Sequence, residues 1–333
     1  SDVCSSDLID ISNFGKYEVT GPGAGDWLDA LVANHVPREI GKSCLTPLIG
    51  MRGGVAGDFT VTMTGDESYM MIGSGMAERY HRRFFDMVPL PDGTGFEVAT
   101  PRIAGFNVAG PRSREMLAGL TDADLSNEGW RFMRSRRIAV GGVDCLAIRV
   151  SFTGDLGWEL HCAVDDQVAL YEILLEAAAA HGGGPVGGRA LGALRIEKGY
   201  GSWGREYSPE YWPQEAGLHG LIKLDKDFLN KEAYLKISNT PPRESLTMFE
   251  VNVTDNADAN GGEPIFLADG TPVGRVTSGS YGYTVGKSLA IGYAREGVVS
   301  AGDRVEIFIL GKPHAATVLD KPPFDAGGER LRA

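Results

Sequence analysis

The sequence lacks the short motifs that mark most nucleotide, metal and hydrolase sites. None of its glycine runs is a G-x-G-x-x-G that follows a strand and opens a helix, and no G-x-x-x-x-G-K-[ST] occurs. H-E-x-x-H and G-x-S-x-G are absent as well. The glycine run at residues 21–26 contains a proline and predicts a turn before a helix. We therefore expect no flavin, nicotinamide or metal site within this chain.

Net positive charge and clustered cysteine are also missing. The formal net charge is −12, which disfavours nucleic-acid binding because a phosphate backbone requires a basic face. The four cysteines (Cys4, Cys44, Cys145 and Cys162) form no Cys-x-x-Cys pair, so we expect free thiols in a reducing compartment. No apolar run reaches the roughly 18 residues that a membrane span requires, so we expect no membrane partner.

The start of the chain carries little information. Residues 1–7 (SDVCSSD) run directly into a strand-like LIDI segment, which indicates a truncated chain or a non-native leader, and we leave them out of the fold prediction. Because no targeting segment is visible, we expect a cytoplasmic protein.

What is present is the composition of a folded protein with more than one domain. The chain has 333 residues, of which 43% are hydrophobic and 23% charged, an ordinary balance for two or three packed units. Alternating polarity and helical spacing predict a recurring order of elements up to about residue 200. The expected strands are 14–20, 55–63, 69–72, 103–108, 137–140, 143–150 and 158–163, and the expected helices are 26–36, 76–88, 112–120, 167–181 and 189–198. This order predicts α+β units with helices on one sheet face, of the duplicated ferredoxin-like kind.

The character of the sequence changes after residue 235. Residues 239–243 (NTPPR) have the composition of a linker. Short strand-like segments follow at 246–253, 263–267, 272–278, 288–294 and 304–309, with Gly and Asp-Gly turns between them. They predict a small all-β barrel or sandwich, with a domain boundary near residue 240.

Three segments combine glycine, aromatic and charged residues more densely than the rest. They are RGGVAGDFTV (52–61), SFTGDLGWEL (151–160) and LRIEKGYGSWGRE (194–206). In the first, Asp58 is either a turn residue or an acid placed where glycines let a ligand nitrogen approach. In the second, alternation puts Glu159 on the face opposite Trp158 and Leu160, where it is either a surface acid or a carboxylate for an amino-pyrimidine edge. The third is either a solvated helix face and its loop or a shaped functional loop.

With these segments in place, the chain resembles the folate-binding, T-protein-like portion of dimethylglycine and sarcosine dehydrogenases, and more distantly the glycine-cleavage aminomethyltransferases. The resemblance extends over roughly residues 8 to 325. The matching pieces, in order, are DISNFGKY (10–17), AN (33–34), AGP (109–111), TGDLGWE (153–159), LRIEK (194–198), WG (203–204), EAGL (215–218) and TSGSY (277–281).

The resemblance implies a cloverleaf of two α+β lobes and a C-terminal β-barrel around a folate channel. The lobes would make up one domain, residues 8–240, and the barrel a second, residues 241–330. Asp58 would be the catalytic acid that faces N5 and N10 of tetrahydrofolate, and Glu159 would bind the pterin ring. Phe152 and Trp203 would contribute aromatic contacts, with Phe152 standing where many members have Tyr. Leu191 stands near the position of a folate-carboxylate arginine in the T-protein, and Arg195 is our candidate cation for the cofactor.

The implied chemistry is the capture of a one-carbon unit by tetrahydrofolate. A flavin in a partner domain or subunit, absent from this chain, would oxidise an N-methyl amine such as dimethylglycine or sarcosine. Folate would take up the product as 5,10-methylenetetrahydrofolate. Two alternatives stay open: a free-standing aminomethyltransferase or folate-dependent demethylase, and a non-catalytic folate-binding protein.

Overall fold

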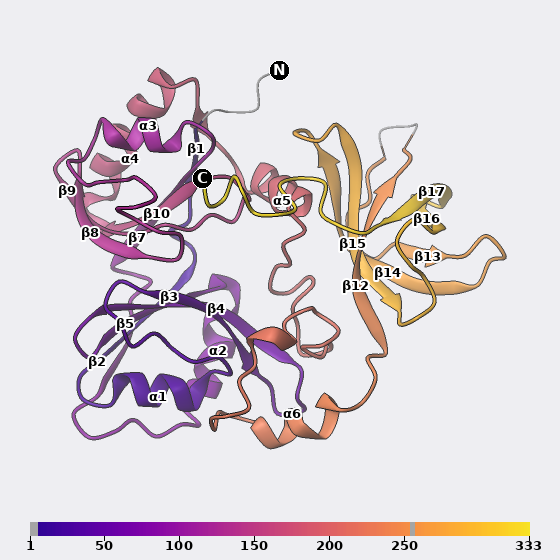
Figure 1. The fold of residues 1–333 in the computed structure, drawn as a ribbon, viewed down its shortest axis with the longest axis horizontal. Coiled ribbons are helices and arrows are strands. Elements are labelled where there is room, and N and C mark those ends of the chain that lie inside the picture. The colour runs from indigo at the N-terminus through magenta and orange to yellow at the C-terminus, as the bar shows by residue number, and fades with distance from the viewer. Residues whose placement is uncertain (1–5, 254–256) are drawn as a thin grey trace.

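The chain folds into two α+β lobes and a separate β-barrel, joined by a long loop (Figure 1). The computed structural model describes residues 6–253 and 257–333. Cys4, one of the expected free thiols, lies outside the described residues, and Cys44, Cys145 and Cys162 are free. No helix in the described part of the chain is long and apolar enough to span a membrane.

The first lobe is a five-stranded antiparallel sheet with helices on one face. Its strand order is β3-β4-β5-β2-β6. The elements are β2 (Gly15–Thr20), α1 (Ala24–Leu31), β3 (Ser43–Ile49), β4 (Val55–Gly65), β5 (Ser68–Gly73), η1 (Gly75–Ala77), α2 (Glu78–Phe85) and β6 (Gly95–Val98). Tyr17 and Phe59 point to the helix-covered face, where they join Leu28 and Phe85 in one buried core. Alternation therefore turns Lys16 and Asp58 to the opposite face of this sheet.

The second lobe is a six-stranded sheet that includes the first strand of the chain. Its order is β11-β1-β7-β10-β9-β8, and only the β1–β11 pair is parallel. The elements are β1 (Asp7–Asp10), β7 (Ile103–Ala109), α3 (Ser113–Ala118), β8 (Ser135–Val140), β9 (Val143–Ile148), β10 (Gly157–Ala163), η2 (Val164–Asp166), α4 (Gln167–Ala180) and β11 (Gly184–Pro185). Trp158 and Leu160 of β10 pack with Leu170 and Leu174 of α4.

The uncovered faces of the two sheets meet between the lobes. Met70 and Ile72 of β5 share a buried cluster with Leu146 and Ile148 of β9. At one edge the lobes are also joined through backbone, since the Ser135 amide donates to the Gly41 carbonyl oxygen at 2.6 Å. Each sheet is therefore covered on both faces, by its own helices and by the other sheet.

The C-terminal part is a closed barrel that is tied back to the lobes. Its strand order is β12-β15-β14-β13-β16-β17, which confirms a barrel rather than a sandwich. The remaining elements are α5 (Gly188–Glu197), η3 (His219–Leu221), α6 (Lys231–Ser238), β12 (Glu244–Val251), β13 (Pro264–Phe266), β14 (Pro272–Gly282), β15 (Lys287–Arg295), β16 (Arg304–Ile309) and β17 (Lys312–Leu319). Helix α5 packs on the barrel through Ile196. The final residues return toward the second lobe (Figure 1), where Arg330 pairs with Asp155.

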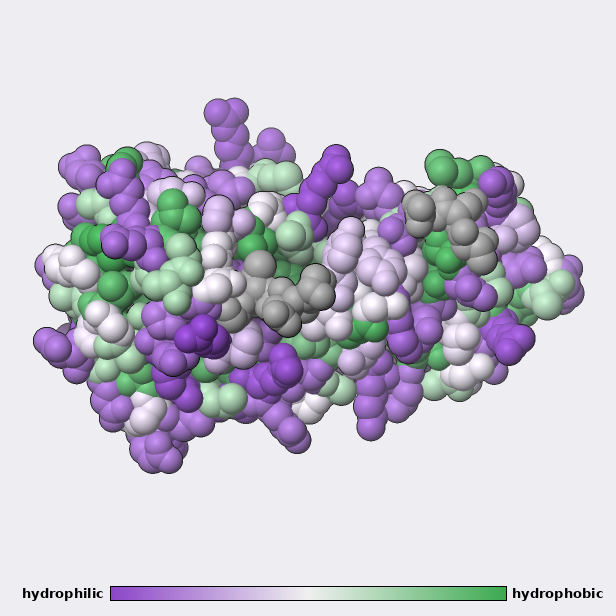
Figure 2. All heavy atoms as spheres, turned by 90° about the horizontal axis from the view of Figure 1, so that it is seen from above, coloured by the Kyte–Doolittle hydropathy of each residue, from purple (hydrophilic) through white to green (hydrophobic). Residues whose placement is uncertain are grey.

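The face of the molecule seen from above is mostly polar (Figure 2). In the space-filling view, hydrophilic side chains cover much of the visible face and hydrophobic ones are scattered among them (Figure 2). This mixture is ordinary for a folded protein and marks no single binding face.

Candidate functional site

Asp58 lies on the face of the first sheet that is turned toward the second lobe. Asp58 is paired with Pro47 of the edge strand β3, and the next residue of β4 on the same face is Thr60. Its Oδ1 atom is buried and has no hydrogen-bond partner among the described residues. Burial raises the pKa of Asp58 to about 6. A desolvated carboxylate with one unpartnered oxygen attracts a ligand cation or proton more strongly than a hydrated carboxylate does.

The glycines before Asp58 accommodate neighbouring parts of the chain. A Cβ on Gly54 would lie 2.3 Å from the Pro209 carbonyl oxygen, and one on Gly53 would lie 2.7 Å from Ile237 Cδ1. A Cβ on Gly57 would lie 2.9 Å from His81 Nε2. These glycines therefore let α6, α2 and the 198–215 loop pack closely before and beside Asp58, and the approach of a ligand nitrogen to Asp58 stays a prediction.

Glu159 lies on the inner face of the second sheet. It is paired with Asn107 of β7 and with Ile148 of β9, and its neighbours Trp158 and Leu160 are fully buried on the helix side. The predicted alternation is therefore confirmed. The Glu159 side chain is only 11% exposed, and its nearest ionisable contact is His161 Nε2, 3.5 Å from Oε2. Within the described residues no donor makes a hydrogen bond to this carboxylate, so its acceptor positions are available to a ligand.

A buried lysine supplies positive charge close to Glu159. The Lys16 side chain is fully buried, and its Nζ donates to the carbonyl oxygens of Ile11, Ser12 and Phe14 at 3.3, 3.0 and 3.1 Å. Burial lowers the pKa of Lys16 to about 8, against the opposing effect of nearby carboxylates, Glu159 first among them. Lys16 was not predicted as a site residue, because its place on the polar side of an alternating strand predicted an exposed side chain.

The two predicted aromatic residues lie in different loops: Phe152 lies between β9 and β10, and Trp203 lies in the loop after α5. Phe152 stacks on Tyr200, with ring centroids 6.0 Å apart. Trp203 stacks on Tyr80 of α2 at 5.6 Å and meets the His81 ring edge-to-face at 5.4 Å. Both rings are partly exposed. Their contact with a folate ring stays a prediction.

Arg195 is held by protein groups. Its guanidinium donates to Glu206 at 2.8 Å, to Ser278 Oγ at 2.6 Å and to the Tyr200 carbonyl oxygen at 2.9 Å. Arg195 and Glu206 are both buried, and the pair links α5 to the loop and to the barrel strand β14. These contacts give Arg195 a structural role, and its proposed contact with the cofactor stays a prediction.

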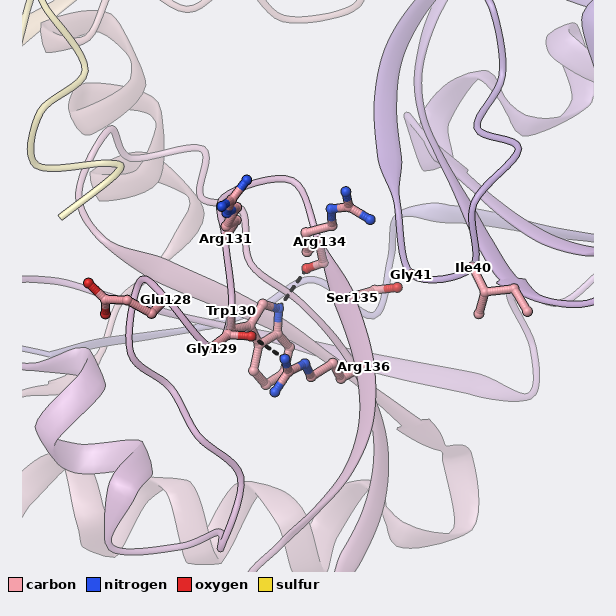
Figure 3. Close-up of a pocket in the computed structure, with 9 residues that line it drawn as sticks. All are labelled: Ile40, Gly41, Glu128, Gly129, Trp130, Arg131, Arg134, Ser135 and Arg136. Carbon is pink, nitrogen blue, oxygen red and sulfur yellow. Dashed lines mark hydrogen bonds between the residues drawn. The ribbon is translucent and has the colours of Figure 1, made fainter.

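Two surface cavities lie away from both acids. One, of about 390 Å³, sits at the seam between the lobes and is lined by Gly41, Ser135 and three arginines (Figure 3). Arg134 is paired there with Glu39, and Arg136 lies over the Trp130 ring. The other, of about 570 Å³, borders the end of α3 and β8. Among the described residues no cluster of His, Cys, Asp and Glu could hold a metal ion.

Family models match almost the whole chain. The GCVT N-terminal domain matches residues 4–226, and the glycine cleavage T-protein C-terminal barrel domain matches residues 245–325. The aminomethyltransferase T of the glycine cleavage system from Bartonella henselae has the same fold, with a TM-score of 0.85 over 97% of this chain and 87% of that one, at 22% identity.

Curated relatives fall into two groups. Mitochondrial dimethylglycine dehydrogenase from Mus musculus is 34% identical over 95% of this chain, which covers 36% of the dehydrogenase. An aminomethyltransferase from Caldanaerobacter subterraneus is 29% identical over 94% of this chain and 83% of its own length. The chain thus spans just over a third of the dehydrogenases that it matches. On its fold and on both domain matches, the chain belongs to the glycine cleavage T-protein (GCVT) family.

Proposed function

We propose that this chain binds tetrahydrofolate and transfers to it the one-carbon unit of an oxidised N-methyl amine, forming 5,10-methylenetetrahydrofolate. The observation that carries the proposal is a pair of carboxylates, Asp58 and Glu159, on the two sheet faces that are turned toward each other. Asp58 has a buried oxygen without a partner, and Glu159 accepts no hydrogen bond within the described chain.

The two acids suit two different tasks. Glu159 lies near the charge of Lys16 and offers two oxygens side by side, which matches the paired N–H donors of an amino-pyrimidine edge. Asp58 is desolvated, so it favours a cationic nitrogen and can accept a proton from it near neutral pH. Phe152 and Trp203 would pack against the flat parts of the ligand.

Tetrahydrofolate supplies two amine nitrogens, N5 and N10, that together take up the one-carbon unit as a methylene bridge. Closing this bridge on a formaldehyde equivalent releases water, and on an iminium it releases the amine. In both cases the nitrogens give up protons. Asp58 is the group of this chain that would stabilise the charge and accept a proton during that closure.

The oxidation that generates the one-carbon unit would take place outside this chain. Dimethylglycine dehydrogenase, sarcosine dehydrogenase and a formaldehyde-forming 4-methylaminobutanoate oxidase each match this chain over less than 40% of their own length. We infer that a flavin-containing domain or subunit supplies the oxidised amine. Dimethylglycine and sarcosine are the proposed donors, and the cytoplasm is the proposed location.

Titration calorimetry and a rate measurement test the proposal together. The purified chain should bind tetrahydrofolate, and Glu159→Ala should abolish most of that binding while Asp58→Asn largely retains it. Asp58→Asn should instead slow the formation of 5,10-methylenetetrahydrofolate from formaldehyde by about 10²–10⁴-fold. Asp66→Asn, an exposed acid in the β4–β5 turn, is the matched control and should change neither quantity. Equal loss of binding and rate in Asp58→Asn would contradict the catalytic role.

One observation favours a second function, that of a free-standing aminomethyltransferase. This chain covers 83% of the relative from Caldanaerobacter subterraneus, which is named an aminomethyltransferase. A protein not much longer than this chain can therefore be an aminomethyltransferase without a dehydrogenase domain. The two functions differ in the donor of the one-carbon unit: an aminomethyl group for the transferase, and an oxidised N-methyl amine for the first proposal. Folate binding without acceleration from either donor would indicate a non-catalytic folate-binding protein.

A further inference from the structure

His161 occupies a position beside Glu159 that no task of the proposed site uses. It lies two residues further along β10, so its ring points to the same inner face. The His161 side chain is 1% exposed, and neither Nδ1 nor Nε2 makes a hydrogen bond within the described chain. The Nε2 atom lies 3.5 Å from Glu159 Oε2. A buried imidazole with both nitrogens unbonded is costly unless one of them serves a partner.

The slot that holds the ring is formed by a glycine of the neighbouring strand. Gly105 of β7 stands opposite His161, and a Cβ there would lie 2.9 Å from His161 Nδ1. The Gly105 backbone is fixed in turn, because its amide donates to Ser12 Oγ at 3.1 Å and its carbonyl oxygen accepts from the same hydroxyl at 3.3 Å. The imidazole therefore rests on a rigid backbone surface, with Nδ1 toward Gly105 and Nε2 toward the acid.

We propose that His161 is a positioning residue that donates its Nε2–H to Glu159 and fixes the plane of that carboxylate for its ligand. The inference rests on the proposed role of Glu159 in binding tetrahydrofolate. A carboxylate that accepts two parallel N–H donors from a ligand keeps further lone pairs free on each oxygen. His161 would take one of these on Oε2, from which its Nε2 stands 3.5 Å away, whereas the nearby Lys16 acts on Glu159 through its charge and does not fix the plane of the carboxylate.

The arrangement also explains why a histidine serves here better than a second cation. Lys16 already compensates the charge of Glu159, and Asp10 and Glu78 contribute further negative charge around Lys16. An imidazole adds a directed N–H donor, which the Lys16 charge does not supply. A ligand that brings its own N–H donors then meets a carboxylate whose orientation is already set, and less rotational freedom is lost on binding.

Nitrogen-15 NMR of histidine-labelled protein tests the His161–Glu159 pair without any ligand. We expect His161 to be the Nε2–H tautomer, because the proposed pairing makes Glu159 the acceptor of the proton on that nitrogen. In Glu159→Met the acceptor is removed, so this tautomer preference should disappear. A predominant Nδ1–H tautomer in the wild-type chain, or a tautomer unaffected by Glu159→Met, would overturn the inference whatever the chain binds.

Calorimetry with tetrahydrofolate tests the consequence for binding. His161→Leu should weaken binding about tenfold or more, the size expected for one hydrogen bond to a charged group. His161→Gln carries an amide N–H near the position of Nε2 and should recover most of the affinity. His219→Leu, in the exposed turn η3, is the matched control and should leave the affinity unchanged.

The outcomes separate this inference from the proposed function. Equal losses in His161→Leu and His161→Gln, with native circular dichroism, would mean that the ring only fills space and would overturn the positioning role. If the wild-type chain binds no tetrahydrofolate, the proposed function fails, and the NMR experiment still decides whether His161 and Glu159 are paired as described.

Discussion

Replacing Asp58 with asparagine should stabilise the protein, and increasingly so as the pH rises. The native carboxyl binds its proton more tightly than in the unfolded chain, since burial raises its pKa from 3.8 to about 6. The unfolded chain therefore releases this proton first, and the free energy of unfolding falls as the pH rises from about 4 to about 6. The asparagine side chain of the variant stays neutral throughout. The free energy of unfolding of the variant should therefore exceed that of the wild type by a growing amount between about pH 4 and about pH 6, and by a constant amount at higher pH.

The magnitude follows from the size of the shift. Each pKa unit corresponds to about 1.4 kcal/mol, so a shift of roughly two units gives an upper bound of about 3 kcal/mol. Asp58 retains some exposure although its Oδ1 is buried, and solvent screening reduces the expected gain to about 1–2 kcal/mol.

Urea unfolding of both proteins at pH 4.5 and at pH 7.5 measures this gain as a double difference. The contributions of the other titrating groups to the free energy of unfolding cancel, because the two proteins share those groups. A difference between variant and wild type that is the same at both pH values would refute the reasoning, since it would mean that the Asp58 carboxyl is effectively hydrated. Asp66→Asn, at an exposed acid, provides the pH-independent reference.

Three further changes probe the structure around the site. Lys16→Met should lower the free energy of unfolding by about 1–3 kcal/mol, because three carbonyl oxygens lose their donor, and a variant as stable as the wild type in urea would contradict this. Arg195→Met should cost about 3–5 kcal/mol by leaving Glu206 buried and unpaired, and the double variant with Glu206→Gln should recover part of the loss in thermal unfolding. Gly54→Val should destabilise by about 1–3 kcal/mol, because its Cβ meets the Pro209 carbonyl oxygen at 2.3 Å; an unchanged melting temperature would show that the loop yields freely.

Much of the fold could be predicted because most strands alternate cleanly and most helices are amphipathic. The strand expected at 103–108 is β7 (Ile103–Ala109), and the helix expected at 189–198 is α5 (Gly188–Glu197). Strand β3 (Ser43–Ile49) was not predicted, since Pro47 in its middle argues against a central strand. The structure places β3 at the edge of its sheet, where a residue without an N–H is tolerated.

Long-range packing accounts for the elements and contacts that were missed. Helix α6 (Lys231–Ser238) was not predicted; it ends directly before the 239–243 linker, and its Ile237 packs against Gly53 and the first lobe. The first strand pairs with β7 rather than with its neighbour β2, a crossing that local patterns do not reveal. Lys16 is buried for the same reason, because the second sheet covers a face that looks polar in the sequence.

The sequence could predict a site residue where the alternation of its own strand decides to which face the side chain points. Alternation was enough to turn Glu159 away from the core that contains Trp158. It could not show that Arg195 would be paired with Glu206, because that contact joins a helix to a loop eleven residues later and to the barrel. The roles of Asp58 and Glu159 toward folate stay proposals. They are supported by the facing positions of the two acids and by the absence, in the described chain, of a donor to Asp58 Oδ1 or to the Glu159 carboxylate.

The proposed role of Asp58 leads to a specific dependence of the transfer rate on pH. Only the ionised carboxylate can stabilise a cationic nitrogen or accept its proton, and with a pKa of about 6 it is mostly ionised at pH 7 and mostly protonated at pH 5. The catalysed rate should therefore fall about tenfold between those values, while Asp58→Asn should be slow and flat over the same range. Single-turnover rates measured with saturating tetrahydrofolate remove the contribution of binding. If the wild-type rate shows no inflection between pH 5 and 7, Asp58 does not act in its ionised form, and the unpartnered oxygen must be assigned to binding instead.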